Sequence, residues 1–333
     1  MHESAGGEPL LLSASDVERA LTLDVAFASQ REAFLRLARG EAVAPDKLTL
    51  PGAPGTAWTL CYAARTAPEG GVVVKVVGVA EHNPARGLPM VNGVVLATDA
   101  ATGRLAAIMD GTSITTQRTA AASAVAVAAL ASDDAAELAV IGSGVQATAH
   151  VLAFARVRPL RLVRLWSPNP RHRHDAASRL DAALEAAVVA VGSAAEAVKG
   201  AAIVATCTHS ATPVVAGDWV EPGCCVVSVG SYDRDRAEVD DRLLQRAAVI
   251  AVDDPAYALR YGGPIIGAIE RGVITPDDLV ALGDILAGSA PGRRSPTDIT
   301  FFNSVGIGAQ DAAAAWAVVR RARELGLGRP IAW

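Results

Sequence analysis

Short apolar runs alternate with helical segments through the second half of the chain, and this alternation restricts the fold more than any other feature. Leu138–Ile141 and Ile203–Ala205 are apolar at every position, whereas a strand with one face in water alternates between apolar and polar residues. Strands that are apolar throughout are typical of a parallel sheet covered by helices on both faces. The pattern predicts an α/β fold with a Rossmann-type doubly wound parallel sheet, and we place that domain at residues 115–309.

The first hundred residues follow a different pattern. Ser15-Asp16-Val17-Glu18 has the form of a capping box, which predicts a helix start, and strand-like runs such as Leu48–Leu50 and Val72–Val79 follow, separated by turns such as Glu69-Gly70-Gly71. A last helix is expected at Asp311–Glu324. We therefore predict a second, α+β domain with an antiparallel sheet, made of residues 1–114 together with 310–333.

Composition excludes several classes of protein. A hydrophobic fraction of 51% and a charged fraction of 20% exclude disorder over most of the length, and a net charge of −5 argues against nucleic acid or an anionic membrane as a partner. No apolar run reaches the ~20 residues of a membrane span, and the N-terminus lacks a secretory signal pattern. The four cysteines lack metal-ligand spacing. We expect a soluble, cytoplasmic protein with reduced thiols and no metal.

The residues after Leu138–Ile141 match a dinucleotide fingerprint. The hexapeptide from Gly142 to Ala147 reads G-x-G-x-x-A, between a predicted strand and a predicted helix. The first Gly permits a tight turn, the second lets the backbone approach a pyrophosphate, and the Ala allows the helix to pack closely. We expect the diphosphate to lie at the helix N-terminus. The predicted cofactor-binding residues here are Gly142, Gly144, Val145, Gln146 and Ala147.

The end of the second Rossmann strand bears on the choice between NAD and NADP. An NAD site places a carboxylate there to hold the ribose 2′-hydroxyl, but Leu162–Trp166 is followed by Ser167, Pro168 and Asn169. Arg171 and Arg173 follow within one helical turn and could pair with a 2′-phosphate, or could lie on a solvated helix face. We expect Ser167, Asn169 and Arg171 to contact the cofactor and NADP to be preferred, with NAD as the alternative.

Two cations stand in apolar surroundings. Lys75, one of only three lysines, lies inside the strand-like run VVVKVVGV, and Arg118 is the only charge in the small-residue helix between Gly111 and Asp133. Burying either charge is costly unless it meets an anion. Lys75 on a solvated sheet face, or Arg118 in an internal salt bridge with Asp110, would be a structural explanation. Capture of a substrate carboxylate is the functional one, and we favour it.

Several longer segments resemble one family. They are MVNGVVLATDAATGRLAAIMDGTSITTQRTAA with LAVIGSGVQATAH, and further KVVGVAEHNPARGLP, GSYDRDRAEVD and ITFFNSVGIGAQD. Together they resemble the ornithine cyclodeaminase/mu-crystallin family over about residues 10–325. The resemblance implies an N-terminal substrate and dimerisation domain completed by the C-terminal helix, a Rossmann domain, and a homodimer whose sheets pair across the interface.

The resemblance also assigns roles. Lys75 and Arg118 match residues that bind the substrate carboxylate, and Lys47 stands where the family usually has an Arg in this role. Val305 matches a position that lines the nicotinamide and substrate pocket. Thr206 and Thr208 match contacts to the cofactor ribose and nicotinamide.

Two departures separate this chain from ornithine cyclodeaminases. Their proton-handling Asp corresponds to Tyr232 here, with Asp233 one place later. The acidic residue that grips the ornithine amine is replaced by Thr59 or Leu60. Both differences favour a mu-crystallin-like ketimine reductase. Lys75 and Asp233 are then the candidate catalytic residues for protonating the imine, with a water molecule as a further alternative.

The expected function is NAD(P)H-dependent reduction of cyclic α-imino acids such as Δ1-pyrroline-2-carboxylate or Δ1-piperideine-2-carboxylate. The partner is thus a small imino or amino acid. Three alternatives remain open: an ornithine cyclodeaminase, an alanine-type amino-acid dehydrogenase, and a non-catalytic protein that binds NADPH or a small ligand.

Overall fold

The chain forms two compact units. The structure is a computed structural model that describes residues 8–53, 56–67 and 70–333. One unit comprises the chain up to Arg118 together with Ile307–Trp333, and the other comprises Thr119–Gly306. The boundary between them falls inside helix α3, Gly111–Leu130. The Glu69 of the predicted turn at 69–71 lies outside the described residues.

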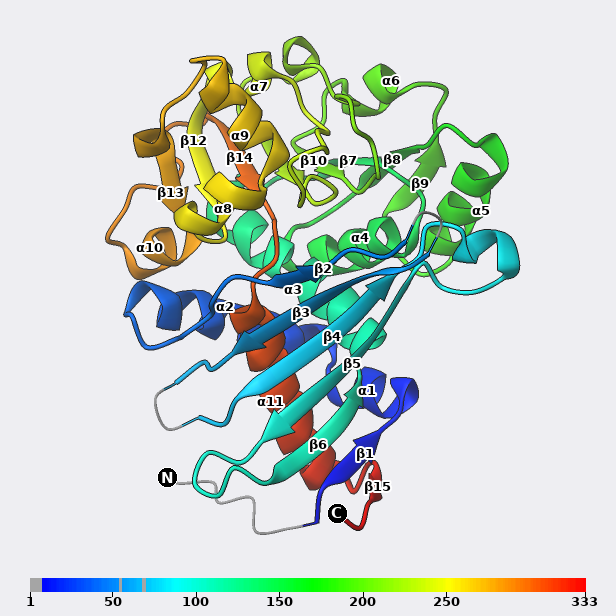
Figure 1. Cartoon of the computed structure of the whole chain (residues 1–333). Helices are drawn as coiled ribbons and strands as arrows, with labels where there is room; N and C mark the ends of the chain where they lie inside the picture. Colours follow the sequence, from blue (N-terminus) through cyan, green and yellow to red (C-terminus); the bar gives the residue numbers. More distant parts are fainter. Residues whose placement is uncertain (1–7, 54–55, 68–69) are drawn as a thin grey trace. The chain divides into compact units, whose positions relative to one another are not determined.

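The first unit is built on a mixed sheet. Among the described residues its strand order is β15-β1-β6-β5-β4-β3-β2 (Figure 1). The sheet is antiparallel except where β1 pairs with β6 in parallel, so the predicted wholly antiparallel sheet is wrong at that pair. The bounds are β1 Leu10–Leu12, β2 Leu48–Leu50, β3 Trp58–Ala64, β4 Val73–Val79, β5 Val91–Thr98, β6 Leu105–Asp110 and β15 Arg329–Pro330.

Helix α11, Gly308–Leu325, crosses one face of this sheet (Figure 1). It packs against α1 (Ala14–Ala20) and α2 (Leu23–Ala38) as well as against β3, β4 and β5. Its buried residues include several alanines, which let the helix backbone approach the strands closely. The Nε1–H of Trp316 donates a hydrogen bond to the carbonyl of Gly71 at 3.1 Å. This helix therefore fastens the C-terminal part of the chain to the N-terminal sheet.

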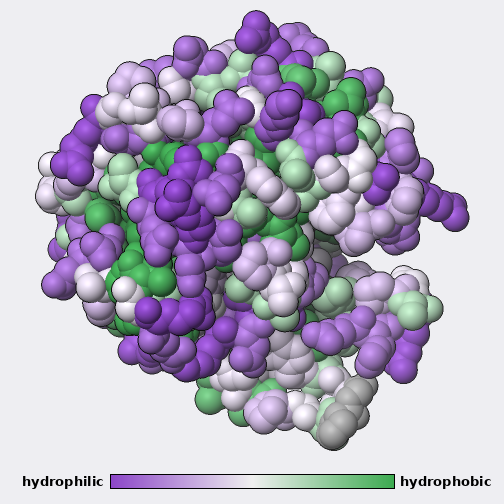
Figure 2. Space-filling model, turned by 90° about the horizontal axis from the view of Figure 1, so that it is seen from above, coloured by the Kyte–Doolittle hydropathy of each residue, from purple (hydrophilic) through white to green (hydrophobic). Residues whose placement is uncertain are grey.

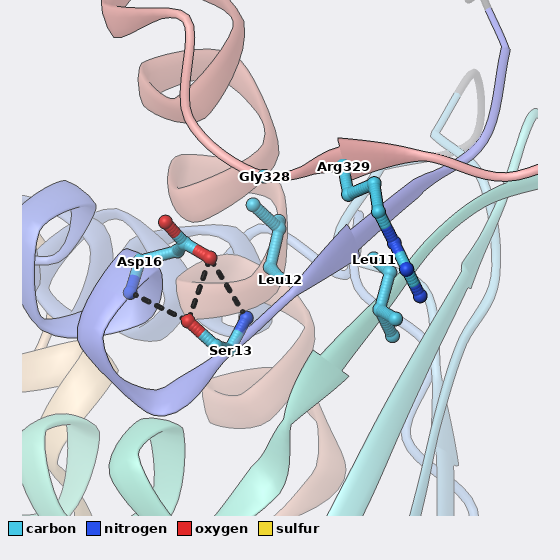
Figure 3. A pocket seen from close by; sticks show the side chains of 6 residues that line it. All are labelled: Leu11, Leu12, Ser13, Asp16, Gly328 and Arg329. Carbon is cyan, nitrogen blue, oxygen red and sulfur yellow. Dashed lines mark hydrogen bonds between the residues drawn. The ribbon is translucent and has the colours of Figure 1, made fainter.

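Helix α1 starts two residues before the position that the sequence pattern indicates. Ser13 is the N-cap, its hydroxyl accepts from the Asp16 backbone N–H at 3.3 Å, and the Asp16 carboxylate accepts from the Ser13 backbone N–H at 3.0 Å (Figure 3). The capping box is therefore Ser13/Asp16, and the predicted Ser15/Glu18 box is wrong. The helix starts earlier than predicted because Leu12 is buried as the last residue of β1, so the N-cap follows directly at Ser13.

The second unit is the predicted Rossmann-type sheet. Its eight described strands, all parallel, have the order β13-β12-β14-β11-β10-β7-β8-β9 (Figure 1). Its core consists largely of Val, Ile and Ala from the strands and from the helices that cover them. The doubly wound α/β class is confirmed. The strands are β7 Glu137–Ile141, β8 Leu162–Trp166, β9 Ala187–Ala190, β10 Ile203–Thr206, β11 Cys225–Ser228, β12 Ala247–Val252, β13 Leu279–Ala281 and β14 Ile299–Asn303.

The order of strands changes direction between β7 and β10. From β7 the chain proceeds outward through β8 and β9, and then returns to place β10 on the other side of β7. In such sheets the carboxyl ends of the strands at the reversal form the ligand site. The helices of this unit are α4 Val145–Val157, α5 Pro170–Asp181, α6 Ala194–Val198, α7 Asp241–Arg246, α8 Pro255–Tyr261, α9 Gly263–Glu270 and α10 Leu282–Ala287.

The surface drawn in Figure 2 is largely hydrophilic, with smaller apolar patches between the polar residues. None of the described helices combines the length and the apolar character needed to cross a membrane.

Candidate functional site: a dinucleotide fingerprint and a buried cationic cluster

The turn between β7 and α4 has the geometry of a cofactor fingerprint. Gly142 has φ +128°, and a Cβ there would lie 2.5 Å from the carbonyl oxygen of Cys207. Only glycine fits this position, because both the backbone conformation and the close approach exclude a side chain. Its N–H donates to the Trp166 carbonyl at 2.8 Å. Gly142 therefore fixes the turn at the reversal of strand order.

Gly144 meets different surroundings. It is the N-cap of α4, and in the described chain no side chain caps this helix start. A Cβ built on Gly144 would have no described atom within 4 Å. Val145 is 68% exposed, whereas Ala147 is buried against the sheet. A helix start with uncapped N–H groups and open space before it suits an anion, so the residues present fit the diphosphate of a dinucleotide.

The residues after β8 divide into fixed and accessible groups. Ser167 is buried, and its hydroxyl accepts from the Ser143 hydroxyl at 2.9 Å. Asn169 caps α5 by accepting the His172 N–H at 3.2 Å. Arg173 donates to the Ser167 carbonyl at 3.1 Å, so it holds the turn. The Arg171 side chain is 88% exposed and lies 3.8 Å from Asp175, which leaves it accessible to a ligand.

A buried carboxylate joins the loops after β10 and β11. Glu238 has no exposed surface, and the hydroxyls of Thr206 and Thr208 donate to it, each at 2.8 Å. The two predicted cofactor contacts thus use their hydroxyl protons on Glu238, and their contact with a cofactor stays a prediction. Sequence reasoning missed Glu238, because one acidic residue in the polar segment RDRAEVD carries no distinguishing pattern.

Val305 lies beyond the end of β14 in a segment held on both sides. Val305 itself is buried, the Ser304 N–H donates to the Ser228 carbonyl at 2.9 Å, and the Gly306 N–H donates to Asp253 at 2.7 Å. Its role in lining a nicotinamide pocket stays a prediction.

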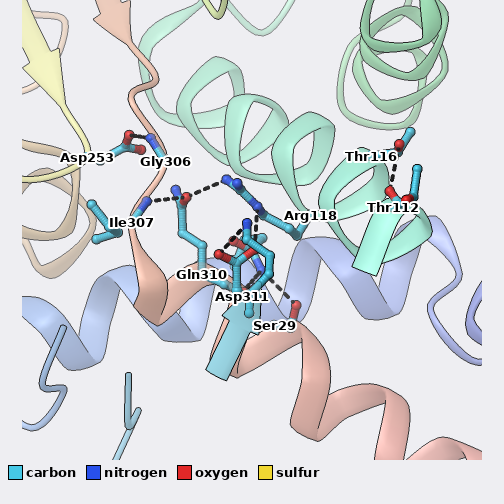
Figure 4. Close-up of polar contacts among 11 residues, drawn as sticks. Ser29, Thr112, Thr116, Arg118, Asp253, Gly306, Ile307, Gln310 and Asp311 are labelled. Atoms are coloured by element: carbon cyan, nitrogen blue, oxygen red, sulfur yellow. Dashed lines mark hydrogen bonds and ion pairs between the residues drawn. The ribbon is translucent and has the colours of Figure 1, made fainter. Parts of the chain in front are cut away.

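The first unit buries three cations: Lys75 and Arg118 pair with one carboxylate, and the charge of Lys47 acts on Lys75. Nζ of Lys75 lies 2.7 Å from Oδ2 of Asp311. Nε of Arg118 donates to Oδ1 of Asp311 at 2.9 Å (Figure 4). Lys47, Lys75, Arg118 and Asp311 are all buried, with exposed fractions between 1% and 7%. We name these four residues the cationic cluster. The structure therefore brings together the three predicted carboxylate-binding residues.

Gln310 supports the arginine of this cluster. Its Oε1 accepts from Nη1 of Arg118 at 2.8 Å and from the Ile307 backbone N–H at 3.2 Å (Figure 4). Its own carbonyl accepts from the side chain of Gln30 at 3.0 Å. The first turn of α11 thus presents both an amide oxygen and a carboxylate to Arg118.

The surroundings of Lys75 lower its pKa to about 8. Burial of the ammonium is the largest cause, and the positive charges of Arg118 and Lys47 lower the pKa further. The Asp311 carboxylate opposes these effects. Nζ also lies 4.5 Å from the centre of the Tyr62 ring, whose face attracts a cation. Lys75 is therefore mostly protonated at neutral pH but can release its proton readily.

Sequence reasoning did not identify Asp311 as a member of the cationic cluster. The salt bridge considered for Arg118 was with Asp110, but Asp110 instead accepts the Ser113 N–H at 2.7 Å at the start of α3. The internal salt bridge of Arg118 is present, but its partner is Asp311, so only the pairing with Asp110 is wrong. Asp311 is 193 residues from Arg118 in the sequence. A signal did exist, because Asp311 is a lone acid in an Ala-rich, apolar helix start.

Asp233, the second predicted catalytic residue, belongs to the Rossmann-type unit. Its carboxylate accepts the Asp235 N–H at 3.3 Å, and the neighbouring Tyr232 ring lies 5.4 Å from the guanidinium of Arg236. Its role in proton transfer stays a prediction.

Two other features carry no candidate chemistry. No group of three His, Cys, Asp or Glu side chains with metal-binding geometry occurs within residues 8–53, 56–67 and 70–333. A surface hollow is lined by residues of β1, the start of α1 and the segment 328–329 (Figure 3). It includes none of the predicted site residues.

The fold and these two groups of residues define a class: a Rossmann-type protein with a dinucleotide fingerprint and a second α+β unit that buries a cationic cluster. A profile of the ornithine cyclodeaminase/mu-crystallin family matches residues 7–326, and the chain belongs to this family.

Three relatives place the chain within the family. Alanine dehydrogenase of Archaeoglobus fulgidus is 32% identical over 97% of this chain and 98% of its own length. Ketimine reductase mu-crystallin of Mus musculus is 31% identical over 92% of this chain and 95% of its own. A solved structure of Thermococcus litoralis Δ1-pyrroline-2-carboxylate reductase, in complex with NADH and L-proline, matches with a TM-score of 0.93 at 33% identity. That match covers 97% of this chain and all of the other.

Proposed function

We propose that this protein is an NAD(P)H-dependent reductase of cyclic α-imino acids such as Δ1-pyrroline-2-carboxylate or Δ1-piperideine-2-carboxylate. The observation that carries the proposal is the cationic cluster: two buried cations, Lys75 and Arg118, share the single carboxylate of Asp311, so this group keeps a positive charge that suits a further carboxylate. The relatives named a reductase of Δ1-pyrroline-2-carboxylate and a ketimine reductase support the substrate class.

Different residues of the cationic cluster attract the substrate carboxylate and orient the groups that bind it. Arg118 and Lys47 attract the substrate carboxylate, and Asp311 with Gln310 holds the Arg118 guanidinium in one orientation. Fixing the carboxylate fixes the imine carbon next to it, which saves most of the entropy cost of alignment. When bound, NADH or NADPH supplies the hydride that this carbon accepts.

Lys75 is the proposed proton donor to the imine nitrogen. Its pKa of about 8 lies near neutral pH, where a general acid is both protonated and ready to release its proton. One hydride and one proton convert the imine to the amine and leave the oxidised cofactor. Asp233 is the alternative donor.

For the cofactor we propose that NADP is preferred over NAD. Ser167 replaces the carboxylate that would repel a 2′-phosphate, and Arg171 is accessible to bind one. Because Arg173 holds the Ser167 carbonyl, Arg171 alone is the proposed phosphate ligand.

We further propose a homodimer formed through the sheet of the first unit. The face opposite α11 is apolar: Cys61 and Val76 are half-buried on it, and Val94, in register with Val76, is 37% exposed. Leu48, at the edge strand β2, is 57% exposed. A soluble monomer rarely exposes so continuous an apolar sheet face, which favours a second copy as its cover.

Turnover of the reduced cofactor tests the proposed activity. The purified protein is mixed with NADPH or NADH and with each cyclic imine, and the loss of reduced nicotinamide absorbance is followed. We expect turnover with the cyclic imines. Turnover with pyruvate and ammonia instead would favour the alanine dehydrogenase activity, for which the Archaeoglobus relative is the supporting observation. Conversion of ornithine to proline without net cofactor change would favour a cyclodeaminase, and cofactor binding without any turnover a binding protein.

A further inference from the structure

The loops that follow β10 and β11 are joined by one fully buried carboxylate, to which neither the sequence motifs nor the proposed function gives a role. We propose that Glu238 is a positioning residue that holds these loops for the nicotinamide half of the dinucleotide and, through its charge, favours the oxidised, positively charged ring. This inference rests on the proposed function, because it presupposes that the chain binds a nicotinamide dinucleotide.

The contacts of Glu238 come from two loops. On the β10 side, Oε1 accepts from the Thr208 backbone N–H at 2.6 Å and from its hydroxyl at 2.8 Å, and Oε2 accepts from the Thr206 hydroxyl at 2.8 Å. On the β11 side, Oε2 accepts from the Gly230 N–H at 2.7 Å and from the Ser228 hydroxyl at 2.9 Å. One side chain thus fastens both loops.

Both oxygens must be acceptors. The backbone N–H groups of Thr208 and Gly230 point at different oxygens of Glu238, and a backbone donor cannot reverse its direction as a hydroxyl can. A glutamine has one amide oxygen and one NH2 group, so in either orientation one backbone N–H would face another donor. The site therefore requires a carboxylate, and an amide of the same shape leaves one loop unfastened.

The place of these loops connects them to the cofactor fingerprint. They follow β10 and β11, and β10 pairs with β7, whose end carries Gly142. The carbonyl of Cys207, between the two threonines, is the atom that a Cβ on Gly142 would meet at 2.5 Å. A Cβ on Gly230 would likewise lie 1.9 Å from the Thr208 carbonyl. Movement of the loop after β10 would therefore disturb the backbone at both Gly142 and Gly230.

The charge of Glu238 is not neutralised by the groups that bind it. Its hydrogen-bond partners in the described chain are hydroxyls and backbone N–H groups, which have no formal charge. Together with burial, this charge raises the pKa of the neighbouring Cys207 thiol well above its ordinary value. In a poorly solvated site such a charge acts over several ångströms, and it would favour a pyridinium over a neutral dihydropyridine.

Direct binding measurements separate this role from a general loss of structure. Glu238→Gln is compared with the wild type by calorimetry for three probes: the oxidised dinucleotide, the reduced dinucleotide, and ADP-ribose, which lacks the nicotinamide. We expect the Kd of the oxidised form to rise roughly tenfold or more, that of the reduced form roughly threefold, and that of ADP-ribose less than about twofold. The matched control is Glu137→Gln, at the opposite end of β7, where the carboxylate pairs with Arg164; it should leave all three values unchanged.

The contrary outcomes are equally definite. If Glu238→Gln raises the Kd of all three probes equally, Glu238 only maintains the fold. If it raises the Kd of the oxidised and reduced forms equally, the proposed electrostatic preference for the oxidised ring is wrong. A wild type that binds ADP-ribose and the dinucleotides while Glu238→Gln binds them unchanged would overturn the inference alone. A wild type that binds none of the probes would overturn it together with the proposed function. If Glu238→Gln fails to fold, Thr206→Val removes one donor from the same carboxylate at a fully buried position and should weaken the dinucleotides several-fold more than ADP-ribose.

Discussion

Lys75 holds a proton in surroundings that disfavour one, and this makes its titration informative. Because the chain has only three lysines, isotope-labelled lysine NMR would resolve each side chain. We expect the Lys75 signal to titrate near pH 8 in the ligand-free protein. The folded state then binds fewer protons than the unfolded state between about pH 8 and 10.5, so this group makes the protein more stable as pH rises through that range. A Lys75 signal that titrates above pH 10 would contradict the burial of Lys75.

Removing Asp311 should lower that pKa further. In Asp311→Asn the attraction to Lys75 is lost while burial and the charges of Arg118 and Lys47 remain. We expect the Lys75 signal to titrate below its wild-type midpoint, and the free energy of unfolding at neutral pH to fall by about 3–5 kcal/mol because two buried cations lose their partner. Asp175→Asn, at an exposed ion pair 3.8 Å long, is the control and should change neither quantity. An unchanged or raised midpoint in Asp311→Asn would disprove the assigned electrostatics.

Arg118 should affect substrate affinity more than cofactor affinity. Arg118→Lys keeps the charge but cannot bind Asp311 and Gln310 together, so the group that faces the substrate loses its fixed orientation. We expect kcat/KM for an imino acid to fall by a factor corresponding to roughly 2–4 kcal/mol, with a raised KM. The Kd of NADPH, measured by fluorescence titration, should stay within about twofold of the wild type. Equal losses in catalysis and in cofactor binding would assign Arg118 to the fold instead.

Sequence reasoning identified most readily the residues whose chemistry conflicts with that of their neighbours. Lys75 in a Val-rich strand and Arg118 in an Ala-rich helix could be singled out because a buried charge requires a partner. The partner itself could not be identified, because Asp311 meets Arg118 only through the packing of α11 on the sheet. Glu238 stood in a polar loop where an acid is unremarkable, and only its burial reveals its function as an acceptor.

At the scale of elements, the sequence predicts β8 correctly but does not predict where β9 begins. The sequence predicts β8 at Leu162–Trp166, where the structure has it, because this segment is apolar except at Arg164 and is followed by the turn residues Ser167, Pro168 and Asn169. Residues 182–187 read AALEAA, which are residues of high helix propensity, so local propensity alone predicts a helix from Arg171 to Ala186. The structure ends α5 at Asp181 and begins β9 at Ala187, so that prediction is wrong. Pairing of β9 with β8 outweighs the helix propensity, and sequence periodicity does not contain that pairing.

The two glycines of the fingerprint should respond to substitution in opposite ways. Gly144→Val adds a side chain where no described atom lies within 4 Å of the Cβ, so we expect a stable protein that no longer binds the dinucleotide because the space before α4 is filled. Gly142→Ala should instead destabilise the fold by at least about 1–3 kcal/mol, because of its φ of +128° and the Cys207 carbonyl. Thermal unfolding and calorimetric titration measure both effects. A folded Gly144→Val protein that binds NADPH normally would place the cofactor elsewhere.

The turn after β8 should decide cofactor preference. A charge-assisted contact between Arg171 and a 2′-phosphate contributes roughly 1.5–3 kcal/mol, which corresponds to about a ten- to hundredfold preference for NADPH. Arg171→Ala should weaken NADPH and leave NADH unchanged, and Ser167→Asp should flatten or reverse the preference. Arg179→Ala, later in α5, is the control for a lost surface charge. Equal wild-type affinities in calorimetry, or tighter binding of NADH, would be incompatible with the NADP assignment.

At the scale of the whole molecule, the uncovered sheet face predicts the state of association. In analytical ultracentrifugation the wild type should sediment with about twice the 34.1 kDa mass of the chain. Val94→Lys places an ammonium on the apolar face, where burial against a second copy would cost several kcal/mol, so the variant should shift toward the monomer. Val189→Lys is the matched control, because Val189 is similarly exposed, at 42%, but belongs to the edge strand β9 of the other sheet. A monomeric wild type would refute the dimer, and a dimer that survives Val94→Lys but dissociates in Val189→Lys would move the interface to the Rossmann-type unit.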